Sequence, residues 1–433
     1  MQDHPVLSQV VFGYCPMIDS QRRVVATRLT VFPERPDAAA DGAALLRAIE
    51  TVWPPDDSPA AVSAPLRLAP RPLDPAAVAK RAAAALPPVV LNLAGEALLR
   101  AVMAAAPGPQ VMIEVPAFMA GDPDHAAVLR KLHGEGTVLL LKGCPLAPLP
   151  ADLLGLFSHS IIDVSEERRI ATPLPPGVGQ IATVQAGART STEIEAAFQR
   201  GAVTVMGWPL DDAAPPGSGR KSAPSEIGVV LELIEGVNRE APVPQLEAVL
   251  RRDPALAFRL LRYLNSPAFG LTAEITSFGH ALAMLGYRPL KRWLALLLAS
   301  SAKGTNAQPL LYAAVRRGLL LEALGREAGS DGDSQMQAET SGEMFICGIF
   351  SLLDHMLRQP FSELLPNMPV PERVQQALTG SGGPYQIYLD LVRAIEQESI
   401  FDVRECSERL LLGPAVVNRA VLKALHTARQ LDI

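Results

Sequence analysis

The chain has 433 residues, of which 48% are hydrophobic and 19% are charged, and its formal net charge is −6. This length predicts two or three domains, and the hydrophobic content excludes a chain that is disordered throughout. A protein that neutralises many phosphates carries a basic excess, so the mild negative charge argues against nucleic acid as a partner.

The first 212 residues alternate between short apolar runs and helical segments. These runs, which are partly β-branched, predict eight strands at residues 10–14, 24–31, 89–93, 111–115, 138–141, 161–164, 180–184 and 203–206. Short continuous runs of this kind suit strands that are buried on both faces. Helical crossovers between most of them predict an α/β barrel of the (βα)8 type over residues 1–212, with an irregular excursion at residues 53–75.

A segment rich in Pro, Gly and Ser follows at residues 213–224 and predicts a linker. From Ser225 to the C-terminus the apolar residues recur at helical spacing. Leu290, Leu294 and Leu297 form one such stripe. We therefore expect an all-α domain at residues 225–433, interrupted by a polar loop at residues 330–340.

Nothing in the chain predicts export or membrane insertion. The first residues lack the basic region and apolar run of a secretory signal, and no stretch reaches the roughly 18 apolar residues of a membrane helix. Cys15, Cys144, Cys347 and Cys406 lie far apart, which favours reduced structural thiols. We expect a cytoplasmic protein.

Residues 253–270, DPALAFRLLRYLNSPAFG, resemble the signature of the HDOD family. The order of the motifs that follow, from 275 to 293, also fits. The resemblance implies an all-α fold related to the HD metal phosphohydrolases, generally without their metal ligands. The nearest counterpart of an HD pair, Asp354-His355, has the reverse order and lies in an apolar stripe, so we predict no metal site there.

A set of polar and basic side chains in this domain is the candidate interaction surface: Arg259, Arg262, Asn265, Ser266, Arg288, Lys291 and Arg292. Three interpretations remain open for it, namely a solvated helix face, a site for an acidic protein and a site for nucleic acid. No aromatic platforms for bases are interleaved with these residues, which disfavours the last.

The opening of the barrel half, at residues 19–29, resembles the first strand region of EAL domains. The resemblance implies a barrel that hydrolyses cyclic di-GMP with metal ions held by carboxylates. Asn92 and Glu114 match metal-binding positions of that family. Arg28 stands where the defining glutamate belongs, Lys142 follows the strand that should end in paired aspartates, and Met206 replaces the usual glutamine.

Two divalent ions need several hard oxygen ligands, and Arg28 and Lys142 reverse the local charge. We therefore expect no metal, no cofactor and no catalytic residue, and a pairing of Glu114 with Arg28 or Lys142. These patterns predict a non-catalytic signal-transduction regulator or scaffold that binds other signalling proteins, linked to cyclic di-GMP pathways, motility or virulence. The alternative is a cyclic di-GMP phosphodiesterase, or a sensor that binds cyclic di-GMP without hydrolysis.

Overall fold

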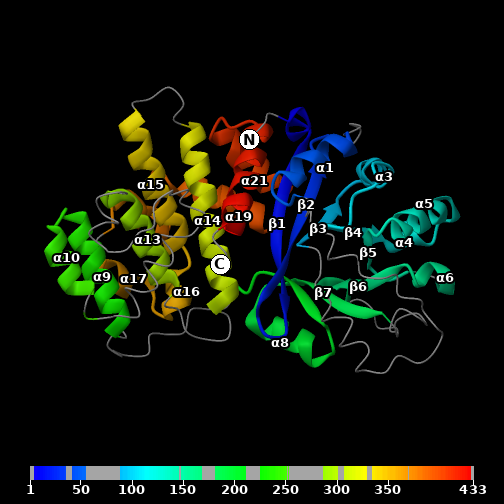
Figure 1. Ribbon diagram of the computed structural model, residues 1–433, viewed down its shortest axis with the longest axis horizontal. Helices are drawn as coiled ribbons and strands as arrows, with labels where there is room; N and C mark the ends of the chain where they lie inside the picture. Colours follow the sequence, from blue (N-terminus) through cyan, green and yellow to red (C-terminus); the bar gives the residue numbers. More distant parts are fainter. Residues whose placement is uncertain are drawn as a thin grey trace. The chain divides into compact units, whose positions relative to one another are not determined.

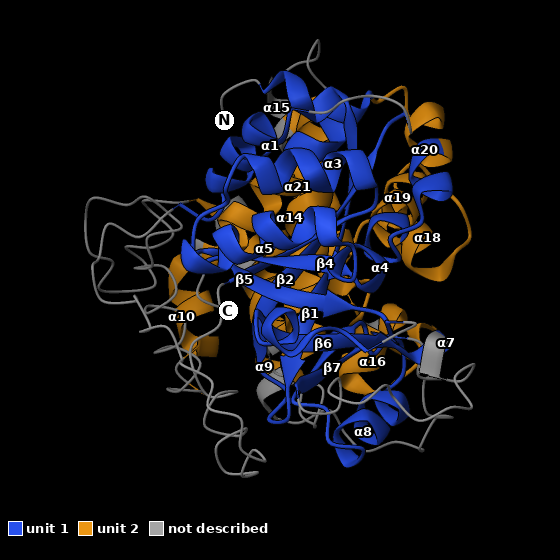
Figure 2. Cartoon of the chain, turned by 90° about the vertical axis from the view of Figure 1, so that its right-hand side faces the viewer, with its two compact units in different colours: residues 1–212, 394–404, 413–419 blue, residues 213–393, 405–412, 420–433 orange. Residues whose placement is uncertain are grey.

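The computed structural model describes residues 4–35, 41–54, 88–145, 148–167, 181–210, 225–250, 252, 286–300, 307–328, 334–368 and 370–430. Figure 1 labels the helices and strands along the chain. The chain divides into two compact units, which are coloured separately in Figure 2. Unit 1 comprises Met1–Asp212 together with Ala394–Arg404 and Gly413–Arg419, and unit 2 comprises Ala213–Arg393, Glu405–Leu412 and Ala420–Ile433.

Unit 1 is built on a closed barrel of eight strands in the order of the sequence. The strands are β1 (Val10–Asp19), β2 (Val24–Pro33), β3 (Val89–Leu93), β4 (Val111–Pro116), β5 (Val138–Lys142), β6 (Phe157–Asp163), β7 (Ala182–Ala188) and β8 (Thr204–Gly207). All five residues of β3 are buried, as expected of a strand covered on both faces. The predicted fold class, a barrel of this type followed by a helical part, is confirmed.

One strand departs from the parallel arrangement. β1 runs antiparallel to both of its neighbours, β2 and β8, whereas the other neighbouring strands pair parallel. The turn at residues 20–23 is too short for a helical crossover, so β1 and β2 form a hairpin. The Asp19 carboxylate accepts the backbone N–H of Gln21 and of Arg23, each at 2.9 Å, and Arg22 takes a left-handed conformation with φ 63°.

At least one helix lies between the strands of each consecutive parallel pair. These helices are α1 (Gly42–Glu50), α3 (Glu96–Ala104), α4 (Ala117–Ala120), α5 (Pro123–Gly134), α6 (Ala151–Leu154), α7 (Val164–Glu167) and α8 (Ser191–Gln199). Helix α8 begins with a capping box in which Thr190 and Glu193 each accept a backbone N–H of the other. It packs on the barrel through a buried cluster of Ile18, Ala188, Ile194, Ala197 and Val205. The excursion expected at residues 53–75 lies almost entirely outside the described residues.

Unit 2 is helical wherever the structure describes it. Its helices are α9 (Ser225–Asn238), α10 (Val243–Leu250), α13 (Tyr287–Ser300), α14 (Ala307–Ala328), α15 (Ser334–Phe350), α16 (Leu353–Leu357), α17 (Phe361–Leu364) and α18 (Glu372–Thr379). The last three helices, α19 (Gln386–Glu396), α20 (Ile400–Arg409) and α21 (Pro414–Gln430), each contribute residues to both units.

Helices α14 and α15 approach closely because glycines lie at their contact. A Cβ atom on Gly348 would fall 2.5 Å from the backbone carbon of Arg317, and one on Gly318 would fall 2.9 Å from Cγ1 of Ile349. The polar loop expected at residues 330–340 is wrong from Ser334 onward, where α15 begins, and residues 330–333 lie outside the described residues. Gln337 lies within this helix and donates to the carbonyl of Arg326, which is on α14, at 2.6 Å.

Residues 225–433 were predicted as one helical domain. Of these, Ala394–Arg404 and Gly413–Arg419 belong to unit 1. The linker expected at residues 213–224 lies outside the described residues.

Candidate functional site

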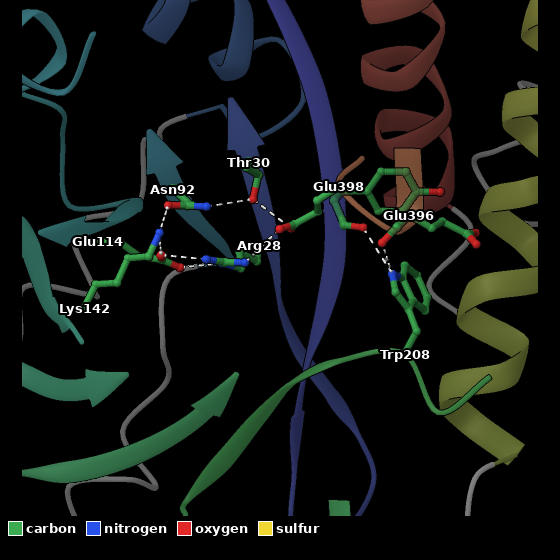
Figure 3. A network of polar contacts seen from close by, with 9 residues as sticks. Arg28, Thr30, Asn92, Glu114, Lys142, Trp208, Glu396 and Glu398 are labelled. Atoms are coloured by element: carbon green, nitrogen blue, oxygen red, sulfur yellow. Dashed lines mark hydrogen bonds and ion pairs between the residues drawn. The ribbon is translucent and has the colours of Figure 1, made fainter. Parts of the chain in front are cut away.

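Polar side chains converge inside one end of the barrel (Figure 3). Arg28 and Thr30 are two residues apart on β2, so they share a face of the strand. Thr30 is paired with Asn92 of β3 in the parallel register. On β4, Glu114 lies two residues before Pro116 and shares its face, and Pro116 is paired with Lys142 of β5. Neighbours in a parallel register project to the same side. The fold therefore brings together four of the five residues that the EAL resemblance singled out: Arg28, Asn92, Glu114 and Lys142.

Arg28 and Glu114 form a bidentate ion pair. Nε of Arg28 lies 2.6 Å from Oε1 of Glu114, and Nη2 lies 2.8 Å from Oε2. The side chain of Glu114 is fully buried, and that of Arg28 is 10% exposed. Bidentate pairing of a guanidinium with a carboxylate adds both energy and geometric specificity to a charged hydrogen bond. The expected pairing of Glu114 with Arg28 is confirmed.

The environment keeps both groups charged. Burial alone raises the pKa of Glu114, but Arg28 and then Lys142 outweigh it, and the pKa is lowered below its usual value. For Arg28, burial works against the charge, but the attraction of Glu114 and then Glu398 outweighs it and raises the pKa well above the usual value. Both side chains are therefore ionised at neutral pH.

Lys142 and Asn92 extend the network on the other side of Glu114. Nζ of Lys142 donates to Oδ1 of Asn92 at 2.7 Å and lies 3.7 Å from Oε2 of Glu114. Nδ2 of Asn92 donates in turn to Oγ1 of Thr30 at 3.1 Å. The side chain of Lys142 is 39% exposed, so it is the member most open to solvent.

A second carboxylate in this network belongs to Glu398, near the C-terminal end of the sequence. Oε2 of Glu398 lies 3.0 Å from Nη1 of Arg28, and Oε1 accepts the hydroxyl of Thr30 at 2.7 Å. Residue 398 belongs to the segment Ala394–Arg404 of unit 1. Glu398 was not predicted as a site residue, because no motif marks it and 370 residues separate it from Arg28.

Met206 stays apart from these polar contacts. It is 1% exposed, on β8, and is paired with Met17 of β1 and Ala186 of β7. Its thioether can offer only a weak acceptor. Cys15 is paired with Arg28 across the β1–β2 hairpin, and burial and then the charge of Glu398 raise the pKa of its thiol.

These residues do not fit the two metal ions that the EAL resemblance implies. Both oxygens of Glu114 receive hydrogen bonds from Arg28, and the amide oxygen of Asn92 receives one from Lys142. Hard divalent cations need several free oxygen ligands and a negative surrounding charge. Within the described ranges, no group of three or more His, Cys, Asp or Glu side chains is arranged to hold a metal.

The candidate interaction surface of the helical part is described only in part. Arg259, Arg262, Asn265 and Ser266 lie outside the described residues, as does the side chain of Arg288. Lys291 is partly buried, and Arg292 is engaged within unit 2. The guanidinium of Arg292 lies 2.8 Å from Oε1 of Glu322 and 4.2 Å from the ring centre of Phe345. This surface stays a prediction.

The reversed Asp354-His355 pair lies in α16 of unit 2. The Asp354 carboxylate accepts the backbone N–H of His355 at 2.9 Å, and its other oxygen lies 3.8 Å from Nε2 of the same histidine. Burial raises the pKa of Asp354 above its usual value, against the opposing attraction of His355. The contacts are local to two adjacent residues.

Comparison with known proteins identifies the helical part. Residues 223–359 match the HDOD domain. The chain is 29% identical over 172 residues to the uncharacterized protein YuxH of Bacillus subtilis (strain 168), covering 39% of this chain and 40% of that protein. It is 26% identical over 158 residues to the cyclic di-GMP phosphodiesterase CdgJ of Vibrio cholerae serotype O1, covering 36% of this chain and 35% of that protein.

The matches thus span well under half the length of these curated relatives. Among solved structures, the chain is similar to the PaMucR phosphodiesterase in complex with c-di-GMP, with TM-score 0.31 and 15% identity, covering 47% of this chain and 91% of that one. It is also similar to the EAL domain of Mycobacterium smegmatis DcpA, with TM-score 0.28 and 18% identity, covering 46% and 90%. None of the described helices is both long and apolar enough to cross a membrane.

The expected order of a closed barrel followed by a helical HDOD domain is confirmed. The chain carries an HDOD domain at residues 223–359, preceded by a closed eight-stranded barrel.

Proposed function

We propose that this chain is a non-catalytic signal-transduction regulator of cyclic di-GMP pathways, in which the barrel keeps the architecture of a phosphodiesterase without its metal chemistry. The observation that carries the proposal is the bidentate pair of Arg28 and Glu114 at 2.6 and 2.8 Å. The guanidinium of Arg28 therefore already supplies a positive charge beside Glu114, which is the one carboxylate among the residues that match the EAL pattern.

Charge and desolvation support this proposal. For Glu114 to bind a divalent ion, Arg28 would have to give up two charged hydrogen bonds while remaining 10% exposed. Breaking a buried ion pair costs about 3–5 kcal/mol. Lys142 adds a second positive charge 3.7 Å from the same carboxylate, which opposes a metal ion further.

The link to cyclic di-GMP rests on the relatives, one of which is named a cyclic di-GMP phosphodiesterase. The HDOD domain supplies the second part of the proposal. Helical domains of this kind offer grooves between amphipathic helices, which suit binding of another protein. We propose another signalling protein as the partner, with Arg259, Arg262, Asn265, Ser266, Arg288 and Lys291 as the first residues to substitute.

The test is calorimetric titration of the full chain with cyclic di-GMP, with and without Mg²⁺ or Mn²⁺, followed by a hydrolysis assay on the same sample. A hydrolytically active EAL domain is the positive control. We expect no turnover and no metal-dependent binding. Metal-dependent turnover would overturn the proposal, because it would require carboxylates other than Glu114 to assemble the site.

A second candidate, a sensor that binds cyclic di-GMP without hydrolysis, is favoured by the partial exposure of Lys142, whose side chain is 39% exposed. Cations of this kind bind phosphate oxygens. In the same titration, metal-independent binding without turnover would support it. Lys142→Ala should then weaken binding, whereas Lys131→Ala, at an exposed lysine of α5, should leave it unchanged.

A further inference from the structure

Glu398 lies in the short turn between α19 and α20. Glu398 takes a left-handed conformation with φ 55°, which is uncommon for a residue with a side chain. Its N–H donates to the carbonyl of Ile395 at 3.2 Å, and that of Ser399 donates to the carbonyl of Ala394 at 3.1 Å. The backbone of this turn is therefore shaped so that one side chain points into the barrel network (Figure 3).

The charges inside the barrel end balance only with Glu398 present. Arg28 and Lys142 are positive, and Glu114 and Glu398 are negative. Glu114 uses both of its oxygens on Arg28, which leaves Nη1 of Arg28 to be satisfied by Glu398. A guanidinium donor left buried without an acceptor is costly, so this position requires an anion or a strong acceptor.

Strand β1 leaves the space that Glu398 needs. Gly13 is paired with Thr30 across the hairpin. A Cβ atom on Gly13 would fall 3.0 Å from Cγ of Glu398, 3.0 Å from the carbonyl oxygen of Ile395 and 3.1 Å from Cα of Glu398. A side chain at position 13 would crowd the turn that carries Glu398, whereas glycine leaves enough space for it.

Two further contacts fix the same segment in unit 1. The indole N–H of Trp208, directly after β8, donates to the carbonyl of Glu396 at 3.0 Å. Arg404 donates to the backbone carbonyl of Glu34, at the end of β2, and lies 3.4 Å from that residue's carboxylate. Glu398 thus belongs to a segment that is held on both sides of the turn.

We propose that the barrel end lined by Arg28 and Thr30 is a carboxylate-binding site, and that its ligand is Glu398 of the same chain. The guanidinium and the hydroxyl each take one oxygen of the carboxylate, at 3.0 and 2.7 Å. Because the ligand is tethered, occupancy of the site holds Ala394–Arg404 in unit 1. The proposal needs neither a metal nor a nucleotide, so it stands or falls separately from the proposed function.

The first test is chemical rescue of full-length Glu398→Ala by a small carboxylate. The change opens the site, and we expect the melting temperature to fall by roughly 3–6 °C in sodium chloride. Sodium formate at the same concentration should restore about half of this loss. In the wild type and in Glu405→Ala, at an exposed glutamate of α20, the two salts should give the same melting temperature.

The second test measures hydrogen exchange in residues 394–404, and it perturbs the site from the opposite side. We expect roughly tenfold faster exchange there in Glu398→Ala and also in Gly13→Ala, which removes space and no charge. Gly134→Ala is the matched control, since a Cβ atom on Gly134 meets nothing within 4 Å.

Should Glu398→Ala fail to fold, as judged by circular dichroism, Glu398→Gln and Gly13→Ala decide the question. Glu398→Gln keeps an acceptor for Thr30 and loses the charge, so faster exchange in both variants would support the site. Unchanged exchange in residues 394–404 in both variants would overturn the proposal, as would a formate effect in Glu398→Ala no larger than that in the wild type.

Discussion

Glu114 and Lys142 show how differently two charges of one network depend on their surroundings. Glu114 is fully buried and takes two charged hydrogen bonds from Arg28, while Lys142 is 39% exposed and lies 3.7 Å from the same carboxylate. Solvent screens an exposed pair, whereas a buried charge that loses its partner has no substitute.

This contrast predicts unequal costs for the two cations. Arg28→Met removes the guanidinium that pairs with Glu114 and Glu398, and it should lower the free energy of unfolding by about 3–5 kcal/mol. Lys142→Met should cost about 1 kcal/mol or less. Urea unfolding of both variants checks this. Equal losses would mean that the bidentate pair contributes no more than a surface contact.

A buried histidine on β6 predicts a dependence of stability on pH. Burial lowers the pKa of His159 from 6.5 to about 4. His159 is therefore protonated near pH 6.5 in the unfolded chain, whereas in the folded chain it is protonated only near pH 4. The stability from neutral His159 is complete above pH 6.5 and is lost as the pH falls through this window, by about 3 kcal/mol.

The measurement is the free energy of unfolding of the wild type and of His159→Gln at pH 7 and pH 4.5. We expect the wild type to lose more stability between these values than the variant, which has no group to titrate at this position. His133→Gln, at an exposed histidine of α5, controls for a general effect of removing a histidine. A parallel fall in all three proteins would exclude His159 as the cause.

At the scale of elements, the close approach of α14 and α15 predicts a pair of opposite effects within α15. Gly348→Ala places a Cβ atom 2.5 Å from the backbone carbon of Arg317 and should destabilise the protein by about 1–3 kcal/mol. Gly342→Ala, in the same helix with nothing within 4 Å, should stabilise it by about 0.5–1 kcal/mol. Thermal unfolding distinguishes them; a loss in both variants would contradict the role given to the contact.

Most of the strands were predictable from the sequence because they contain short apolar runs that the barrel buries, but β6 begins at Phe157, before its predicted run, and β7 continues to Ala188, beyond its predicted run. β3 was predicted with its observed limits, Val89–Leu93. The antiparallel course of β1 was not predicted, because the expected strand stopped at Tyr14 and left room for a crossover, whereas β1 continues to Asp19. The start of α15 was missed because residues 334–340 are mostly polar. Their composition alone does not show that this segment packs against α14.

The residues of the candidate site also differ in whether the sequence could predict them. The pairing of Arg28 with Glu114 could be predicted because both lie on strands whose order in the barrel follows the sequence. Glu398 could not be predicted, because the residues that accommodate it, Gly13 and Thr30, carry no sequence signal for a partner so far along the chain.

At the scale of the whole molecule, the polypeptide enters unit 1 three times, and the third passage, Gly413–Arg419, is fixed by one side chain. Oδ1 of Asn418 accepts the N–H of Phe12 at 3.0 Å, and Nδ2 donates to the carbonyls of Leu7 and Val10 at 2.8 and 2.6 Å. Asn418 is 1% exposed, so water cannot replace these bonds. One amide near the C-terminus thus satisfies three backbone groups at the start of the barrel.

Asn418→Ala should therefore destabilise the first strand of the barrel, although the barrel's own sequence is unchanged. Each buried backbone group left unpaired costs about 1–3 kcal/mol, and we expect a loss of about 3 kcal/mol with faster hydrogen exchange in residues 7–12. Lys423→Ala, at an exposed position of the same helix, is the control and should change neither quantity. Normal protection of residues 7–12 in Asn418→Ala would mean that the barrel is complete within the first 212 residues. Loss of that protection would mean that a fragment ending at residue 212 lacks part of its own fold, so that experiments on the barrel require the full chain.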